Sequence, residues 1–312
     1  MATSPWAAHG DADFPIPDGH SFALCLTHDV DRPYKRAAQS VFYALQDRPG
    51  HHLRTLRTPG NPYWQFEEIA ALEDARGVRS AFYVLNEPPI HEKGLGAFGS
   101  PRAWVEQLGR YDVDAPELAD TLRWLADGGW EVGLHGSLAS VGDVDRLAEE
   151  KAALEAVLGD TVRGGRQHRL RLDAPATWRD HRSVGLAYDA TLGSATTTGF
   201  DHGYHPIRPF DDAFVVFPLT IMEQALPDPG TDPDAAWAVC EQLLRAAAEH
   251  GAVMTVLWHP RYFNDEEFPG YRALYERCLD TAIELGGWVG SPGALYDAQT
   301  QSRRDPRAPI RR

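Results

Sequence analysis

FALCLTHDVD, residues 22–31, joins an apolar run to a short polar one, and this transition decides how we interpret the fold. The apolar half, 22–26, predicts a buried strand. Asp29 and Asp31 follow at alternate positions, so in an extended chain both carboxylates point the same way and are able to share a cation and activate its water. Taken alone, the two aspartates fit equally well as caps of the next segment, where Pro33 restricts the backbone.

Composition limits the classes of protein to which the chain can belong. It has 312 residues, of which 43% are hydrophobic, enough for a large core in one big α/β domain or two small ones. The formal net charge of −15 argues against a general binder of nucleic acid or anionic membranes, because phosphate attracts the opposite sign. These features predict a neutral or cationic partner.

The cysteines and the N-terminus bear on the cellular compartment. Cys25, Cys240 and Cys278 lie in apolar patterns without C-x-x-C spacing, so we expect core residues rather than a thiolate zinc site. Residues 1–20 lack a basic start followed by an apolar run, and no stretch approaches 18 consecutive apolar residues. We therefore expect a cytoplasmic protein without a membrane span.

Apolar runs alternate with helical patterns along most of the chain, which is typical of βα units around a mostly parallel sheet. Strands are predicted over 21–27, 80–85, 130–134, 162–166, 186–190 and 253–258, and helices over 66–75, 116–127, 143–158, 232–250 and 269–285, before a final strand and helix. This amounts to roughly seven units. We expect one domain over 21–300, an N-terminal extension over 1–20 and a disordered basic tail over 301–312.

Polar side chains recur where the predicted strands end. In a βα barrel this edge carries the active site. Each residue alone has a plainer explanation, as a hydrogen-bonded rim residue, a turn residue or half of a surface ion pair. Their recurrence at five strand ends favours a site, and the candidates are Asp29, Asp31, His135, Arg166, His168, Asp189 and His259.

This set resembles the motifs of the polysaccharide deacetylase, or NodB-like, family, the carbohydrate esterase family 4 type. The resemblance covers about 22–290. It implies a distorted (β/α)7 barrel and a metal-dependent hydrolase that removes acetyl groups from N-acetylated sugars. The D-x-D run implies that Asp29 is the general base and that Asp31 binds the metal, and His135-Gly136-Ser137 implies a second ligand in His135.

The remaining motifs imply three supporting roles. Arg166 resembles the arginine that holds the base carboxylate in place. His259, in Leu257-Trp258-His259, resembles the histidine that acts as general acid. Asp189 resembles the acid that orients this histidine.

One position departs from the family pattern. Ala139 stands where the family has a second histidine ligand, four residues after His135. A catalytic zinc normally keeps three protein ligands and a water. His168 is our first candidate for the third ligand, His28, His202 and His205 are weaker ones, and without any of them the protein would bind metal poorly.

The resulting functional expectation is a hydrolase of a non-peptide C–N bond that uses a divalent metal, zinc by the resemblance, and acts on an acetylated carbohydrate. A ureide or cyclic-imide hydrolase, or an impaired glycan-binding or biosynthesis accessory protein, remains an alternative. The irregular stretches 87–114 and 193–209 are expected to line the site. Their aromatic residues are candidates to stack on a sugar or to anchor the loops: Trp104, Tyr111, Phe200 and Tyr204.

Overall fold

The structure is a computed structural model that describes residues 6, 9–12, 14–37, 40–41, 60–90, 99, 107 and 109–304. The expected basic tail, 301–312, begins inside the last helix, and its residues after Arg304 lie outside the described part. Within the N-terminal stretch, Gly10 bridges to Ile207, and the ring of Phe14 packs edge-on against Phe217. This stretch therefore contributes to the core.

In the described part of the chain, nine strands form a single sheet, and the strand pairs between them are parallel. The order is β6-β5-β4-β3-β2-β1-β8-β7, and β9 pairs with β1 off this path. The strands are β1 (Phe22–Val30), β2 (Ala81–Leu85), β3 (Glu131–Gly136), β4 (Gly164–Gln167), β5 (Tyr188–Asp189), β6 (Val215–Val216), β7 (Leu219–Met222), β8 (Val253–Leu257) and β9 (Gly287–Gly290).

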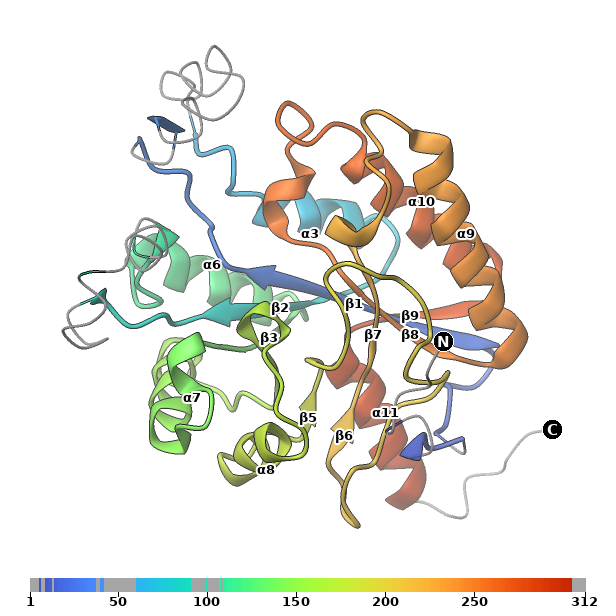
Figure 1. The fold of residues 1–312 in the computed structure, drawn as a ribbon, viewed down its shortest axis with the longest axis horizontal. Coiled ribbons are helices and arrows are strands. Elements are labelled where there is room, and N and C mark those ends of the chain that lie inside the picture. Colours follow the sequence, from blue (N-terminus) through green and yellow to red (C-terminus); the bar gives the residue numbers. More distant parts are fainter. Residues whose placement is uncertain are drawn as a thin grey trace.

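Seven α-helices in the described part lie around the outside of the curled sheet (Figure 1). They are α3 (Phe66–Asp74), α6 (Pro116–Asp127), α7 (Val144–Leu158), α8 (Ala176–Ser183), α9 (Pro233–His250), α10 (Tyr271–Glu284) and α11 (Pro292–Arg304). This arrangement is the distorted α/β barrel that the sequence predicts. No described helix is both long and apolar enough to cross a membrane.

Strand β1 occupies the centre of the sheet. All nine of its residues are buried, as the apolar run predicts. Along one edge Phe22 pairs with Gly287 of β9 and Thr27 with Ala81 of β2, while along the other Ala23 pairs with Val253 of β8. Because the strands are parallel, their C-terminal ends meet at one edge of the sheet, where the site lies.

The long helices end where the sequence predicts. The Asp143 side chain accepts a hydrogen bond from the Arg146 backbone N–H and caps the start of α7, and Gly159 ends it with a left-handed φ of 70°. Helix α9 follows the same pattern, with Asp232 at its start and Gly251 at its end. Helix α8 and strands β6 and β7 were not predicted.

Tyrosines packed against glycines fill the interior of the barrel. A Cβ atom on Gly133 would lie 2.6 Å from the Tyr83 ring, and one on Gly164 would lie 1.8 Å from the Tyr188 ring. Only glycine fits at these two positions. The three cysteines are also buried, as predicted.

A buried carboxylate, Glu73, ties α3 to the sheet and to α10. Its oxygens accept hydrogen bonds from Tyr275 Oη at 2.7 Å, Trp130 Nε1 at 2.7 Å and the Ser80 backbone N–H at 3.1 Å, and His28 Nε2 lies 3.1 Å away. Burial raises the pKa of Glu73, but the hydrogen bonds from its partners outweigh burial and lower it. The charge is therefore stabilised inside the core.

Tyr275→Phe is expected to lower the free energy of unfolding by about 1–3 kcal/mol, because a buried carboxylate oxygen loses a donor. Urea unfolding at pH 7 measures this effect. A depressed carboxylate pKa contributes stability above the group's usual pKa of 4.5 and loses it as the pH falls, so the deficit should shrink in acid. Tyr296→Phe is the control, since within the described part the Tyr296 hydroxyl makes no hydrogen bond; an equal loss in both variants would contradict this account.

Candidate active site

Asp29, the last but one residue of β1, is held by Arg166 of β4. Arg166 Nη1 donates to Asp29 Oδ1 at 2.7 Å and to Thr27 Oγ1 at 2.9 Å, while its Nε donates to the Ala190 backbone oxygen at 2.8 Å. The guanidinium also lies over the Tyr83 ring, 5.0 Å from its centroid. The expected contact between Arg166 and Asp29 is therefore present. The Arg166 side chain that makes it is itself held by Thr27, Ala190 and Tyr83.

The electrostatic surroundings favour the ionised form of Asp29. Burial acts to raise its pKa, but Arg166 first and then His135 and His259 lower it below the usual value. A carboxylate that is charged at neutral pH can accept a proton.

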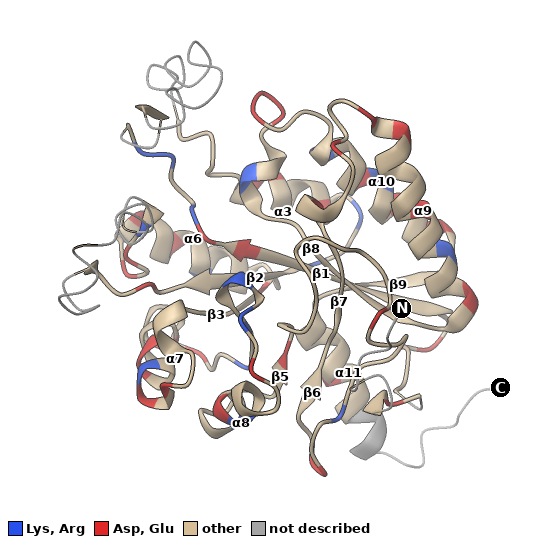
Figure 2. Ribbon diagram, in the orientation of Figure 1, with Lys and Arg blue, Asp and Glu red and all other residues tan. Residues whose placement is uncertain are grey.

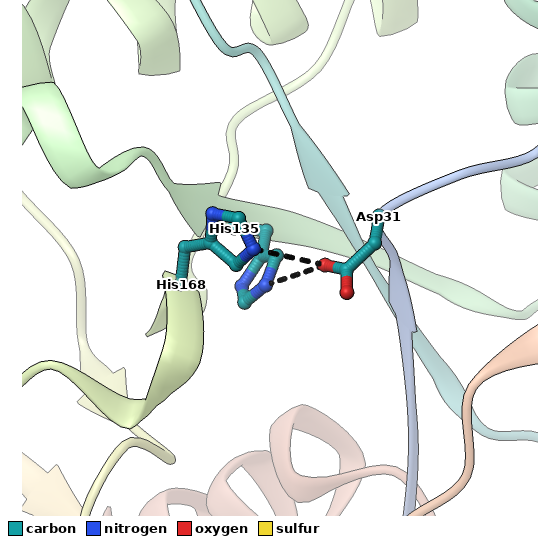
Figure 3. Close-up of side chains that lie close together, drawn as sticks. All are labelled: Asp31, His135 and His168. Carbon is teal, nitrogen blue, oxygen red and sulfur yellow. Dashed lines mark ion pairs between the residues drawn. The ribbon is translucent and has the colours of Figure 1, made fainter. Parts of the chain in front are cut away.

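Asp31, His135 and His168 converge from the ends of β1, β3 and β4 (Figure 3). Asp31 Oδ1 lies 3.2 Å from His135 Nε2 and 3.7 Å from His168 Nε2. Ligands about 2.1 Å from a tetrahedral zinc lie about 3.4 Å from one another. Asp31 Oδ1 is buried without a hydrogen-bond partner in the described part, so these residues fit a divalent metal that would satisfy it.

The hydrogen bonds of His135 prepare it to be a ligand. Its Nδ1 lies 2.9 Å from the backbone oxygen of Arg166, which can only accept, so Nδ1 carries a proton and Nε2 is the nitrogen that would bind a metal. Burial raises the pKa of Asp31, but His168, His135 and His259 together hold it well below the usual range. Asp31 therefore faces the histidines as a carboxylate.

Two left-handed residues follow His168. Arg169 has φ 58° and Leu170 has φ 52°, in a region that non-glycine residues rarely adopt and that costs of order 1–3 kcal/mol per residue. Residues 168–170 all line the same cavity. The strained turn therefore directly follows His168, which would supply the third ligand atom of the cluster.

His259, which follows β8, is paired with Glu223 rather than with the expected Asp189. His259 Nδ1 lies 2.7 Å from Glu223 Oε1, and its Nε2 lies 3.4 Å from Asp31 Oδ2. Strand β7 pairs with β8, with Met222 opposite Leu257, so the residue after β7 reaches the histidine. Strand β5, which carries Asp189, is five positions away from β8 in the sheet order.

Asp189 has a different set of partners, and our expectation for its role was wrong. Trp178 Nε1 donates to Asp189 Oδ1 at 3.0 Å, the Thr191 backbone N–H donates to the same oxygen at 2.9 Å, and His181 Nδ1 lies 3.0 Å from Oδ2. Asp189 therefore fastens α8 to the sheet beneath the site.

Glu223 is the site residue that sequence reasoning missed. The signal was present, because the apolar run 214–222 ends at Glu223 in the same way that other strands end in polar residues. Pro218 interrupts this run, and the two strands within it are only two and four residues long. Such short strands give no periodic pattern that would mark where they end.

Glu223→Gln is expected to lower kcat by roughly ten- to a hundredfold, a part of the 10² to 10⁴ that a positioned proton donor contributes. The amide cannot hold the charged form of His259 as the carboxylate does. Turnover of the hydrolysis that the sequence predicts, measured at saturating substrate, gives kcat, and Asp189→Asn is the comparison. An Asp189→Asn loss larger than that of Glu223→Gln, with both proteins folded, would favour the original assignment.

The other candidate ligands lie elsewhere. His28 is buried against Glu73, and neither His202 nor His205 lines the cavity. Ala139 is exposed on a short 3-10 helix, Leu138–Ser140, and does not line the cavity either. Within the described part, His168 is the histidine that joins Asp31 and His135.

The cluster opens into a cavity of about 390 Å³. Residues of both irregular stretches, 87–114 and 193–209, line this cavity, as expected. Tyr111 lines it, whereas Phe200 and Tyr204 pack on one another at 4.9 Å between ring centroids and do not; Trp104 lies outside the described residues. The lining side chains include Asp29, Asp31, Arg32, Glu87, Arg110, Tyr111, His135, His168, Arg169, Met222, Gln224, His259 and Arg261.

Comparison with solved structures finds the same fold in another protein over nearly the whole chain. A Mycobacterium smegmatis protein, whose name assigns it to the polysaccharide deacetylases, is 20% identical and superposes with a TM-score of 0.60, covering 97% of this chain and 95% of that one. The chain has the polysaccharide deacetylase fold. No protein-family model and no curated protein matches the sequence.

Two further solved structures superpose less well. The peptidoglycan deacetylase PdaC of Bacillus subtilis is 11% identical over 94% of this chain and 96% of that one, with a TM-score of 0.46. A Bacillus anthracis protein described as a CE4 family pseudoenzyme is 13% identical over 88% of this chain and 66% of that one, with a TM-score of 0.48. A fold does not by itself decide activity, which has to be argued from the site.

Proposed function

We propose that the protein is a metal-dependent hydrolase of a non-peptide C–N bond that removes the acetyl group from an N-acetylated sugar. The observation that carries this proposal is the convergence of Asp31, His135 and His168 beside an Asp29 held by Arg166. Two imidazoles and a carboxylate suit zinc. When bound, the metal would lower the pKa of a water molecule and polarise the acyl carbonyl.

The chain's own residues would supply the proton transfers. Asp29, kept ionised by Arg166, would accept the proton of the attacking water. Positioned general-base catalysis of this kind contributes roughly 10² to 10⁴ in rate. Arg166 would hold the carboxylate in one orientation through the attack, because its guanidinium is itself fixed to Thr27 and Ala190.

His259 would protonate the leaving amine, which is a poor leaving group without a proton. Burial lowers the pKa of His259, but Glu223 and Asp31 outweigh it and raise the pKa to about 10, so the imidazole is charged at neutral pH. Its Nε2 faces the cluster and its Nδ1 faces Glu223. These contacts support a role as general acid.

The test of this function is metal analysis of the purified protein followed by an acetate-release assay on N-acetylated monosaccharides and oligosaccharides. We expect about one bound divalent metal per chain. Hydrolysis should stop after chelation and return when metal is added. A protein that takes up no metal and hydrolyses no amide would overturn the proposal.

A further inference from the structure

Four arginines line the cavity of a strongly acidic protein. Arg32 follows β1, Arg110 precedes α6, Arg169 follows β4 and Arg261 follows β8, so they come from four separate loops at the same edge of the sheet. Acidic residues are spread over outer helices such as α7, α8 and α9 (Figure 2). In a chain of net charge −15, the cavity thus carries four arginines beside three carboxylates, Asp29, Asp31 and Glu87.

Arg261 is the most informative of the four. It is half-buried, and within the described part no carboxylate lies within ion-pair distance of its guanidinium. The guanidinium lies 5.2 Å from the centroid of the Tyr262 ring. By contrast, Arg110 already pairs with Asp112 at 2.6 Å. A cation that faces a cavity without a carboxylate partner is suited to bind an anion there.

The other charged groups of the site already pair with one another. Arg166 pairs with Asp29, and His259 Nδ1 lies 2.7 Å from Glu223 Oε1. A divalent metal on Asp31 and two histidines would leave one positive charge, and Glu87, 3.8 Å from His168 Nδ1, would offset it. The metal centre therefore adds no net charge, and it is the guanidinium of Arg261 that would attract an anion beside the reacting group.

We propose that the substrate carries a phosphate or a carboxylate and that Arg261 binds this anionic group. This inference rests on the proposed function and specifies its substrate class as an N-acylated sugar with an oxyanion substituent. The planar guanidinium presents paired N–H donors that match both groups, whereas a neutral sugar needs no such partner. Arg169 and Arg110 line the same cavity and lie within the site that would enclose the anion.

Calorimetric binding to the metal-loaded Asp29→Asn variant, which should keep its metal but turn over slowly, tests the proposal with little turnover. The probes are N-acetylglucosamine, N-acetylglucosamine 6-phosphate and N-acetylmuramic acid. We expect at least one anionic sugar to bind ten or more times more tightly than the neutral one. The two anionic probes distinguish phosphate from carboxylate, and equal binding of all three would overturn the inference.

Variants assign the preference to Arg261. Arg261→Gln should abolish the preference for the anionic sugar, and Arg261→Lys should retain part of it, since a charge remains without the planar fork. Arg245→Gln, at an exposed position on α9 where the arginine pairs with Glu241, is the matched control and should keep the preference. A full preference in Arg261→Gln would contradict the assignment to this residue.

Acetate release measured in parallel separates this inference from the proposed function. Hydrolysis of neutral and anionic sugars with equal kcat/KM would refute the anionic substrate and leave the hydrolase standing. Arg261-dependent binding of an anionic sugar, without hydrolysis of any amide under metal-loaded conditions, would refute the hydrolase and leave the anion site standing.

Discussion

Asp29→Asn should lower the rate of metal-dependent acetate release by roughly 10² to 10⁴, while the bound metal stays in place. Asparagine preserves the shape of the side chain and can still accept the hydrogen bond from Arg166, but it cannot take a proton from water. The rate of the chemical step should fall, whereas metal binding should not change. The measurement pairs kcat with metal content on the same preparation.

The matched variant is Asp31→Asn, two residues along the same chain segment. It makes the same chemical change at the carboxylate whose oxygen lies 3.2 Å from His135 Nε2. Here metal and activity should be lost together. If Asp29→Asn lost its metal while Asp31→Asn kept it, the two aspartates would have exchanged roles.

His168→Ala should weaken metal binding by at least about a hundredfold, since losing even a supporting contact costs ten- to a hundredfold and this change removes a ligand. The prediction follows from the position of His168 Nε2, 3.7 Å from Asp31 Oδ1. Titration with a competing chelator gives the metal dissociation constant of each variant. Activity should fall at low metal concentration and recover in part when metal is in excess.

His202→Ala and His205→Ala are the controls, because both residues are histidines of the neighbouring loop that do not line the cavity. They should keep the metal affinity of the unchanged protein. Loss of metal in either of them, with His168→Ala unaffected, would move the third ligand into that loop.

The centre of the fold could be predicted from the sequence because its signals are local. The apolar run before Asp29 is long enough to mark β1, and the cap residues Asp143 and Gly159 mark both ends of α7. The rule that strand ends carry site residues then found Asp31, His135 and His168, which the structure brings together. These inferences need only periodicity and chain direction.

The partner of His259 could not be predicted, because it depends on which strands are neighbours. Asp189 and Glu223 are both acids at strand ends, and only the sheet order places one of them beside β8. The contact of Arg166 with the Ala190 backbone likewise depends on how β4 and β5 curve past one another. Such contacts are set by tertiary packing and leave no local trace in the sequence.

The pairing of β1 with β8 and β9 also constrains how the protein is made. Ala23 pairs with Val253, roughly 230 residues later, so one edge of an apolar central strand has no partner until most of the chain has been synthesised. At about 5–20 residues per second the ribosome needs about 12 to 46 s to reach that point. During that interval the nascent chain exposes an unpaired apolar strand, so we expect chaperones as well as the stability of the finished barrel to affect its yield in the cell.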